Sequence, residues 1–313
     1  MTNLSEFTFL SSDGKTQLHG MLWEPEGVAV RAVLQICHGV AEHIARYDGF
    51  ARALNEQGIV VAGHDHLGHG KSLPEGGTPV YFGDGNTWNT VVDDIYVLHQ
   101  RLKQRYPDVP LCIMGHSMGS FLTRTYLIRY PGTVKAAVIM GTGWQPRAAI
   151  TGGLALANAI AAVSGENATS ELVTELAFGS YNKLFAPNRT KVDWLSADDS
   201  NVDDYIADPL CGADATVGLF RQMLHGIRFN QRQSHLRQMD REMPVLFVAG
   251  DKDPVGSCGK GVRQTYDAFR AAGMRDCTLK LYPGLRHEIL NEKAYTADIT
   301  KNIEAWLLSR LEK

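Results

Sequence analysis

A serine set between two glycines, in the pentapeptide GHSMG at residues 115–119, constrains the fold of this chain more than any other feature. An apolar run precedes it and a helical pattern follows, so the serine stands where a strand passes into a helix. Gly115 and Gly119 leave room there for a tight, strained turn that lifts the Ser117 hydroxyl clear of the sheet. Free N–H groups at the start of the next helix favour negative charge beside it. The spacing predicts a nucleophile elbow with Ser117 at its tip.

Short apolar runs alternate with longer helical patterns, which is typical of a mostly parallel sheet covered by helices on both faces. The first two strands are separated by a polar turn and are expected to form an antiparallel hairpin. The predicted strands are residues 6–10, 17–23, 31–38, 59–63, 111–114, 134–140, 244–250 and 278–282. The predicted helices are residues 47–57, 87–105, 121–127, 262–272 and 298–311.

The alternation lapses between residues 144 and 239, where the pattern indicates helices and loops without a clear strand. We therefore expect a core domain made of residues 1–143 and 240–313, and a helical insertion made of residues 144–239. Loops at the C-terminal ends of parallel strands carry the chemistry in such folds. An insertion at that edge is predicted to form a lid over the site.

A serine hydroxyl is a weak nucleophile and needs a general base that is itself oriented by an acid. In elbow enzymes the chain order is serine, acid, histidine, with each residue just past a strand. Asp251 and Asp253 follow the seventh predicted strand, and His287 follows the eighth. We assign His287 as the base and Asp253 as the acid, because Asp253 lies further from the sheet edge, on a loop held by Pro254. Asp251 is interpreted as a turn residue that accepts backbone hydrogen bonds.

A tetrahedral oxyanion needs two converging backbone donors. One is predicted to be the N–H of Met118, directly after the nucleophile. The other is expected in the turn after the third strand, where Gly39 permits a close backbone approach and the N–H of Val40 is the candidate donor. The residues expected to support these loops are His38, Gly39, Gly115, His116 and Gly119.

Length and composition bound the possible functions. The chain has 313 residues, 44% of them hydrophobic, which suits one large domain with an insertion. A net charge of −3 gives no electrostatic reason to expect a nucleic-acid partner. Five cysteines lack CxxC spacing, and Cys37 and Cys112 lie in apolar runs, which predicts buried thiols. The N-terminus lacks a signal-peptide pattern and no apolar run reaches the roughly 20 residues of a membrane span, so we expect a cytoplasmic protein.

Several segments resemble one family. Residues 38–47 are similar to the HGxxEHxxRY stretch of monoacylglycerol lipases and related lysophospholipases, and residues 63–72 to their HDHxGHGxS loop. The elbow resembles their GHSMGG, with Ser120 in place of the last glycine. The resemblance implies an α/β-hydrolase fold, with a mostly parallel eight-stranded sheet and a helical lid, in the branch of serine aminopeptidase-like hydrolases. It places the catalytic triad on Ser117, Asp253 and His287, without a cofactor.

Ester hydrolysis is the activity that the resemblance favours, on monoacylglycerols or lysophospholipids. A general carboxylesterase, a serine aminopeptidase and a ligand-binding protein with a hydrolase fold stay open as alternatives. Epoxide hydrolases and dehalogenases share the fold but have aspartate at the elbow. A metal hydrolase is a further alternative, because imidazoles and a carboxylate at short spacing are good zinc ligands. Its candidate ligands are His64, Asp65, His66 and His69.

The insertion holds one segment without charge, residues 148–163. A helix that is apolar on all sides is either packed in the protein or faces lipid or an apolar ligand. The segment is therefore expected to be a packed helix, or to line an acyl tunnel or touch a membrane surface transiently, with Gly152 and Gly153 allowing it to flex. The acidic residues between 192 and 211 are interpreted as a solvated face. No oligomeric state is indicated.

Overall fold

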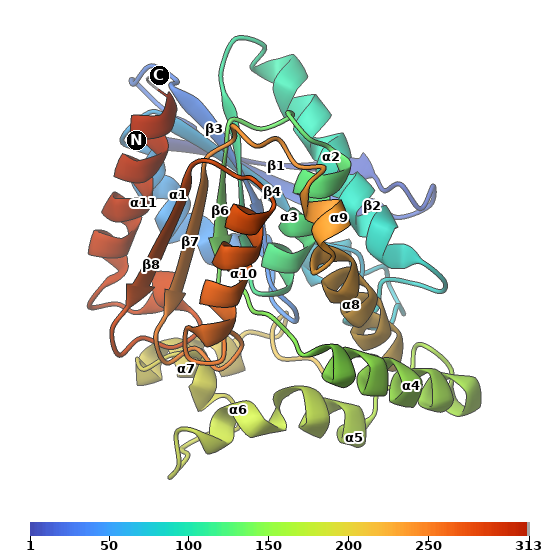
Figure 1. Cartoon of the computed structure of the whole chain (residues 1–313). Coiled ribbons are helices and arrows are strands. Elements are labelled where there is room, and N and C mark those ends of the chain that lie inside the picture. Colours follow the sequence, from blue (N-terminus) through green and yellow to red (C-terminus); the bar gives the residue numbers. More distant parts are fainter. Residues whose placement is uncertain (312–313) are drawn as a thin grey trace.

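The chain forms one mixed sheet, shown in Figure 1 as a computed structural model that describes residues 1–311. Within these residues the strands run in the order β1-β2-β4-β3-β5-β6-β7-β8. β2 is antiparallel to β1 and to β4, and all other neighbours are parallel. The prediction of a mostly parallel eight-stranded sheet that begins with a hairpin is confirmed. The strands are β1 (Thr2–Leu10), β2 (Gln17–Pro25), β3 (Ala32–Cys37), β4 (Ile59–His64), β5 (Leu111–His116), β6 (Ala136–Met140), β7 (Val245–Gly250) and β8 (Cys277–Tyr282).

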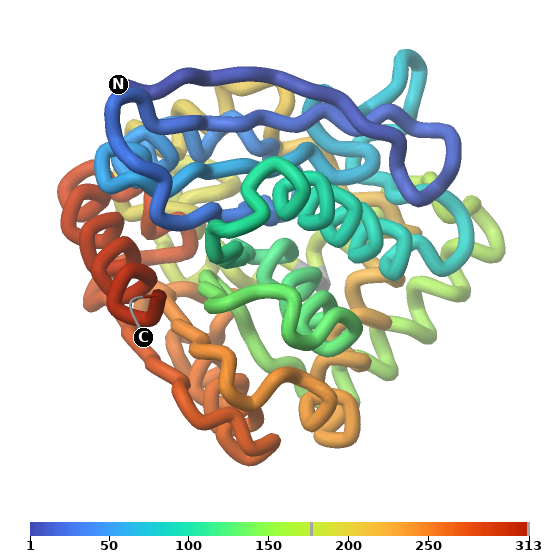
Figure 2. Tube along the Cα trace, turned by 90° about the horizontal axis from the view of Figure 1, so that it is seen from above, coloured from blue at the N-terminus to red at the C-terminus, as the bar shows by residue number. Residues whose placement is uncertain are grey.

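The central strands β3 to β7 are buried at every position, as expected of apolar runs covered on both faces. Helices α1 (Asp48–Asn55) and α11 (Thr296–Leu311) pack on one face, and α2 (Thr87–Arg105), α3 (Met118–Arg129) and α10 (Lys260–Ala271) on the other. The β1–β2 hairpin lies along one border of the molecule, seen from above in Figure 2. Cys37 and Cys112 are buried free thiols, as predicted.

Between β6 and β7 the described chain forms helices, short helical turns and one isolated bridge, Thr169–Thr216. The lapse in strand–helix alternation is thus confirmed. The first helices of this inserted segment lie beyond the C-terminal ends of the strands, and α8 returns beside α3 (Figure 1). The helices are α4 (Arg147–Ser164), α5 (Glu171–Thr174), α6 (Ser180–Lys183), α7 (Asp199–Ala207), α8 (Val217–Asn230) and α9 (Gln233–Leu236).

Helix α4 contains the uncharged segment, residues 148–163, and is only partly packed. Ile150, Leu154 and Ala157 are buried, whereas most other positions are exposed or half-buried. By length and composition alone, α4 could cross a membrane, which for a single helix is weak evidence of a span. Its buried face instead packs against α8.

Candidate active site

Ser117 occupies a sharp turn between β5 and α3. Its backbone has φ 53° and ψ −122°, a strained conformation for a residue with a side chain. A Cβ atom at Gly115 would lie 2.2 Å from the carbonyl oxygen of Gly119, and one at Gly119 would lie 2.0 Å from the carbonyl oxygen of Cys37. Both flanking positions therefore require glycine. The turn has the geometry of a nucleophile elbow.

Asp253 and His287 meet from two neighbouring loops, after β7 and β8. Asp253 Oδ1 lies 3.0 Å from His287 Nδ1, and both side chains are almost fully buried. The N–H of Val255 donates to the same carboxylate oxygen, which fixes its direction. Asp251 instead accepts a hydrogen bond from the N–H of Gly284, as a turn residue does. The carboxylate that faces the imidazole is therefore that of Asp253.

The turn after β3 approaches the elbow closely. A Cβ atom at Gly39 would lie 3.0 Å from Ser117 Cβ, so glycine is needed for this approach. Val40 and Met118 line one cavity together with Ser117. Met118 is the first residue of α3, where backbone N–H groups lack intrahelical acceptors. None of the hydrogen bonds found within residues 1–311 uses the N–H of Val40.

His38 stabilises the turn after β3. Its Nδ1 lies 2.8 Å from the carbonyl oxygen of Gly39, and its Nε2 accepts the N–H of His66. Its ring is therefore neutral with the proton on Nδ1, and burial lowers its pKa. His38 thus links the turn after β3 to the loop after β4.

The histidine-rich loop after β4 does not gather its side chains as a metal site would. Asp65 instead binds the backbone N–H groups of Ile44 and Lys71 and the ring of His19. Within residues 1–311, three metal-ligating atoms converge at a different place, on His43, Asp208 and Cys211. The metal alternative therefore has no geometric support at residues 64–69.

Glu42 is a buried carboxylate beneath the elbow that the sequence analysis did not single out. Its Oε1 accepts the N–H of Gly39 at 2.5 Å and the hydroxyl of Tyr47 at 3.1 Å, and it lies 3.2 Å from His116 Nδ1. Burial alone would raise the pKa of Glu42, but the hydrogen bond with His116 and the charges of His116 and Arg46 hold it well below its usual range. Glu42 is therefore ionised and ties the turn after β3 to β5.

Arg46 extends this network to the histidine loop. It donates to Glu42 Oε2 at 3.0 Å and to both oxygens of Glu288, at 2.7 and 2.8 Å. Asn201 of α7 also donates to Glu288, and His116 Nε2 lies 3.3 Å from the carbonyl oxygen of His287. One buried network thus joins the loops of the nucleophile, the base and the candidate oxyanion donor to the inserted segment. The sequence holds one local signal for this network, the spacing of four residues between Glu42 and Arg46, but none for the pairing of Arg46 with Glu288.

Two cavities meet at the elbow. One, of about 350 Å³, is mainly apolar and runs between α3, α4 and α8. The other, of about 1130 Å³, is more polar, opens toward α5 to α7 and includes His287. Both are lined by Val40, Ser117, Phe178 and Trp194. The apolar branch is lined further by Ala149, Ile150, Gly152, Gly153, Leu156, Phe220, Met223, Leu224 and Ile227.

Comparison with known proteins identifies the family of this chain. The profile of the family described as "Serine aminopeptidase, S33" matches residues 28–294. The chain belongs to this family. Within the family it is 31% identical to a monoacylglycerol lipase of Mycolicibacterium smegmatis, over 98% of each chain. It is 28% identical to the mouse monoglyceride lipase, over 96% of this chain and 90% of the relative.

Solved structures of similar proteins have the same fold. A carboxyl esterase from Bacillus coagulans in complex with glycerol superimposes with a TM-score of 0.92 and 26% identity, over 99% of this chain and 100% of the other. The fold of this S33-family chain is therefore the α/β-hydrolase fold, as the resemblance implied.

Proposed function

We propose that this chain is a serine hydrolase that cleaves carboxylic esters of the monoacylglycerol or lysophospholipid type. The observation that carries the proposal is the arrangement around Ser117. The strained elbow serine lines one cavity with His287, whose ring lies 3.0 Å from Asp253, and a second, apolar cavity starts at the same serine. The family and the full-length likeness to monoacylglycerol lipases support this activity.

The proposed reaction runs through an acyl-enzyme. His287 Nε2 takes the proton of Ser117 as Oγ attacks the ester carbonyl carbon, and Asp253 stabilises the imidazolium that forms. The N–H groups of Val40 and Met118 donate to the oxyanion. As the tetrahedral intermediate collapses, His287 Nε2 returns the proton to the leaving alcohol. Water then attacks the acyl-enzyme in the same way and releases the acid. His287 Nε2 has no hydrogen-bond partner within residues 1–311, so its hydrogen bond with Ser117 Oγ has to form when the substrate binds.

The apolar cavity suits the acyl chain. Gly152 and Leu156 of α4 lie on its wall, opposite residues of α8. Each methylene that leaves water gains up to about 0.8 kcal/mol. A chain that extends into this branch would place its carbonyl at Ser117 and its alcohol in the wider, polar branch. We therefore propose medium-to-long single-chain esters as substrates.

The test is a series of nitrophenyl esters and monoacylglycerols from acetate to palmitate. We expect kcat/KM to rise by up to about fourfold per methylene until the cavity is filled. Leu156→Trp should cancel this rise and leave acetate hydrolysis unchanged, whereas Ala155→Trp, on the exposed side of α4, should change neither. A maximum at acetate or butyrate in the wild type would refute the lipid substrate and favour a general carboxylesterase.

A separate experiment tests the role of Ser117 as the nucleophile. Ser117→Ala should abolish turnover and labelling by a fluorophosphonate, whereas Ser120→Ala should keep both. Ser120 is a suitable control because it is buried beside the nucleophile and only donates to the carbonyl oxygen of Ser117. Slow, substoichiometric labelling of the wild type would support a ligand-binding protein instead of an enzyme.

An aminopeptidase is the second candidate, favoured by the description of the family and by carboxylates on the wider cavity outside the Arg46 network, namely Glu171, Glu175 and Asp214. Glu175 is paired with Lys183 and so is partly neutralised. Aminoacyl anilides distinguish the two activities. A kcat/KM on these substrates that exceeds the value for every ester would overturn the esterase proposal.

We further propose that residues 144–239 act as a lid over the site. Phe178 and Trp194 of this segment line both cavities, and the Trp194 ring centroid is 5.1 Å from that of His287. The exposed side chains of Val163 and Leu172 support a transient contact with a membrane surface. The cytoplasmic location stays a prediction.

A further inference from the structure

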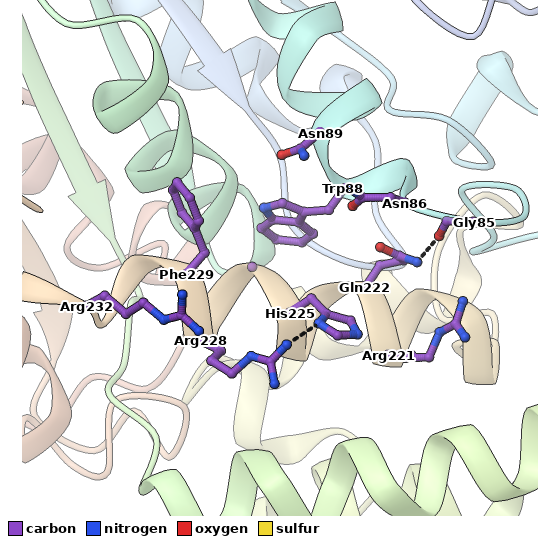
Figure 3. Close-up of a pocket in the computed structure, with 11 residues that line it drawn as sticks. Gly85, Asn86, Trp88, Asn89, Arg221, Gln222, His225, Arg228, Phe229 and Arg232 are labelled. Atoms are coloured by element: carbon purple, nitrogen blue, oxygen red, sulfur yellow. Dashed lines mark hydrogen bonds between the residues drawn. The ribbon is translucent and has the colours of Figure 1, made fainter. Parts of the chain in front are cut away.

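A third cavity, of about 430 Å³, lies on the side of α8 away from the apolar cavity at Ser117. Figure 3 shows it between α8 and the start of α2. It shares no lining residue with the two cavities at Ser117. Its chemistry also differs, because much of its wall is cationic. We call it the basic groove and define it by Arg221, Gln222, His225, Arg228 and Arg232 together with Gly85, Asn86, Trp88, Asn89, Gly226 and Phe229.

The basic side chains of the groove form a stripe on α8. Arg221, His225 and Arg228 follow one another at spacings of four and three residues, and Arg232 comes in the turn after the helix. Arg221 is paired with Glu166. Within residues 1–311, Arg228 and Arg232 form no ion pair with a carboxylate, and Arg228 donates to His225 Nδ1 at 2.9 Å. The groove thus holds two guanidinium groups without an anionic partner.

The opposite wall also offers donors. Asn86 is the N-cap of α2, its side chain makes no capping hydrogen bond, and the first turn of this 19-residue helix contains no acidic residue. Among the described residues no side chain is found to accept from the backbone N–H groups at this end, which carry the positive end of the helix dipole. Arginines and a helix start facing one cavity are a common arrangement for phosphate.

Gln222 is the independent sign of a ligand. Gln222 is only 3% exposed, and its amide nitrogen donates to the carbonyl oxygen of Gly85. Its Oε1 is buried and has no hydrogen-bond partner within residues 1–311. An unpaired buried carbonyl oxygen is costly, and a donor from a ligand would relieve that cost. Figure 3 shows this side chain on the wall of the groove.

We propose that the basic groove binds a phosphate ester that carries a hydroxyl group, as a polyol phosphate does. The phosphate oxygens accept from Arg228, Arg232 and the start of α2, and the hydroxyl donates to Gln222 Oε1. A phosphate has enough acceptor oxygens for several guanidinium forks, whereas a carboxylate is saturated by about one. The proposal does not depend on the activity at Ser117.

Calorimetric titration with glycerol 3-phosphate, inorganic phosphate and glycerol at constant ionic strength tests it. We expect glycerol 3-phosphate to bind more tightly than inorganic phosphate, and glycerol alone not to bind. The double variant Arg228→Gln/Arg232→Gln should weaken glycerol 3-phosphate by about tenfold or more. The control Arg237→Gln/Arg263→Gln removes the same charge from exposed positions outside the groove and should bind like the wild type.

Gln222→Met probes the hydroxyl separately. It should reduce glycerol 3-phosphate to the affinity of inorganic phosphate and leave inorganic phosphate unchanged. Flotation with phosphatidylcholine vesicles, with and without phosphatidic acid, distinguishes the source of the ligand. Binding confined to the acidic vesicles, and lost in the double arginine variant, would identify a lipid headgroup. No saturable binding to either source, or equal losses in the double variant and its control, would overturn the proposal.

Discussion

The loops of the sheet domain and the helices of the inserted segment are built in different ways. Under the elbow, Glu42, Arg46 and Glu288 form a buried network that joins three loops. The inserted segment has a small apolar cluster of its own, Ala157, Val173 and Val217, and its helices α5 and α6 are four residues long. Large apolar side chains such as Leu172 and Leu184 are exposed there.

This difference suits the two regions to two different tasks. Acyl transfer needs donors and proton acceptors held to a fraction of an ångström, which a network of buried charges provides. Admission of a long, flexible acyl chain needs walls that can adjust, and short helices with few buried contacts adjust at low cost. The following predictions test whether precision lies in the sheet domain and adaptability in the insertion.

The largest effect is expected at the acid. Asp253→Asn should lower kcat by on the order of 10⁴-fold, because an amide no longer stabilises the imidazolium or selects its tautomer. Asp251→Asn is the matched control two residues away and should retain most activity, since Asp251 only accepts a backbone hydrogen bond from Gly284. Steady-state kinetics on one ester measures both. Strong loss in the Asp251 variant with survival of the Asp253 variant would reverse the assignment.

Removing the cation of the network should destabilise the fold. Arg46→Met leaves the carboxylates of Glu42 and Glu288 buried without their shared partner, which costs about 3–5 kcal/mol. Urea unfolding measures this free energy. Arg52→Met is the control, because Arg52 makes the same kind of pair with Asp48 but both side chains are exposed, and little change is expected. Equal losses would show that the buried network adds no more stability than an exposed ion pair.

The same network predicts how stability depends on pH. The charge of Arg46 and its hydrogen bonds outweigh burial and lower the pKa of Glu288 below its ordinary value of 4.5. In acid the unfolded chain therefore binds more protons than the folded one. The stabilisation is complete above about pH 4.5 and is lost as the pH falls through the lower, folded-state pKa. Unfolding free energies between about pH 7 and pH 3 should fall less steeply in Glu288→Gln than in the wild type, and parallel curves would contradict the assignment.

The smallest effect is expected in α4. A Cβ atom at Gly152 would meet nothing within 4 Å, so Gly152→Ala should stabilise the protein by about 0.5–1 kcal/mol through helix propensity. At Gly153 the added atom would lie 2.8 Å from Leu224 Cδ1, so the gain there should be smaller or reversed. Thermal unfolding compares the two variants. If the insertion needs a flexible α4, Gly152→Ala should also slow the hydrolysis of long-chain esters.

The sequence predicted most of the sheet domain because its signals are local. Strands such as β5 and β7 are continuous apolar runs, and α2 begins and ends at the predicted residues. The elbow and the order of the three candidate catalytic residues follow from glycine spacing and strand ends. Helix boundaries elsewhere differ by up to three residues, as at α3, which begins at Met118 where residue 121 was predicted.

What the sequence did not give depends on contacts between distant segments. Arg46 and Glu288 are 242 positions apart, and neither residue type predicts a partner at that distance. Helix α4 is packed on one side and lines a cavity on another. Predicting this arrangement requires knowledge of where α8 lies. Histidines and an aspartate at short spacing left a metal site open as an alternative, because sequence spacing does not reveal that Asp65 is held by backbone N–H groups.

Helix α8 separates two cavities, with Met223, Leu224 and Ile227 on the apolar cavity and His225 and Arg228 on the basic groove. Because α8 forms a wall of both, a displacement of this helix that widens one cavity narrows the other. If an occupant of the groove moves it, the affinity for the acyl chain changes, and thermodynamic linkage requires the acyl chain to change the affinity of that occupant by the same factor.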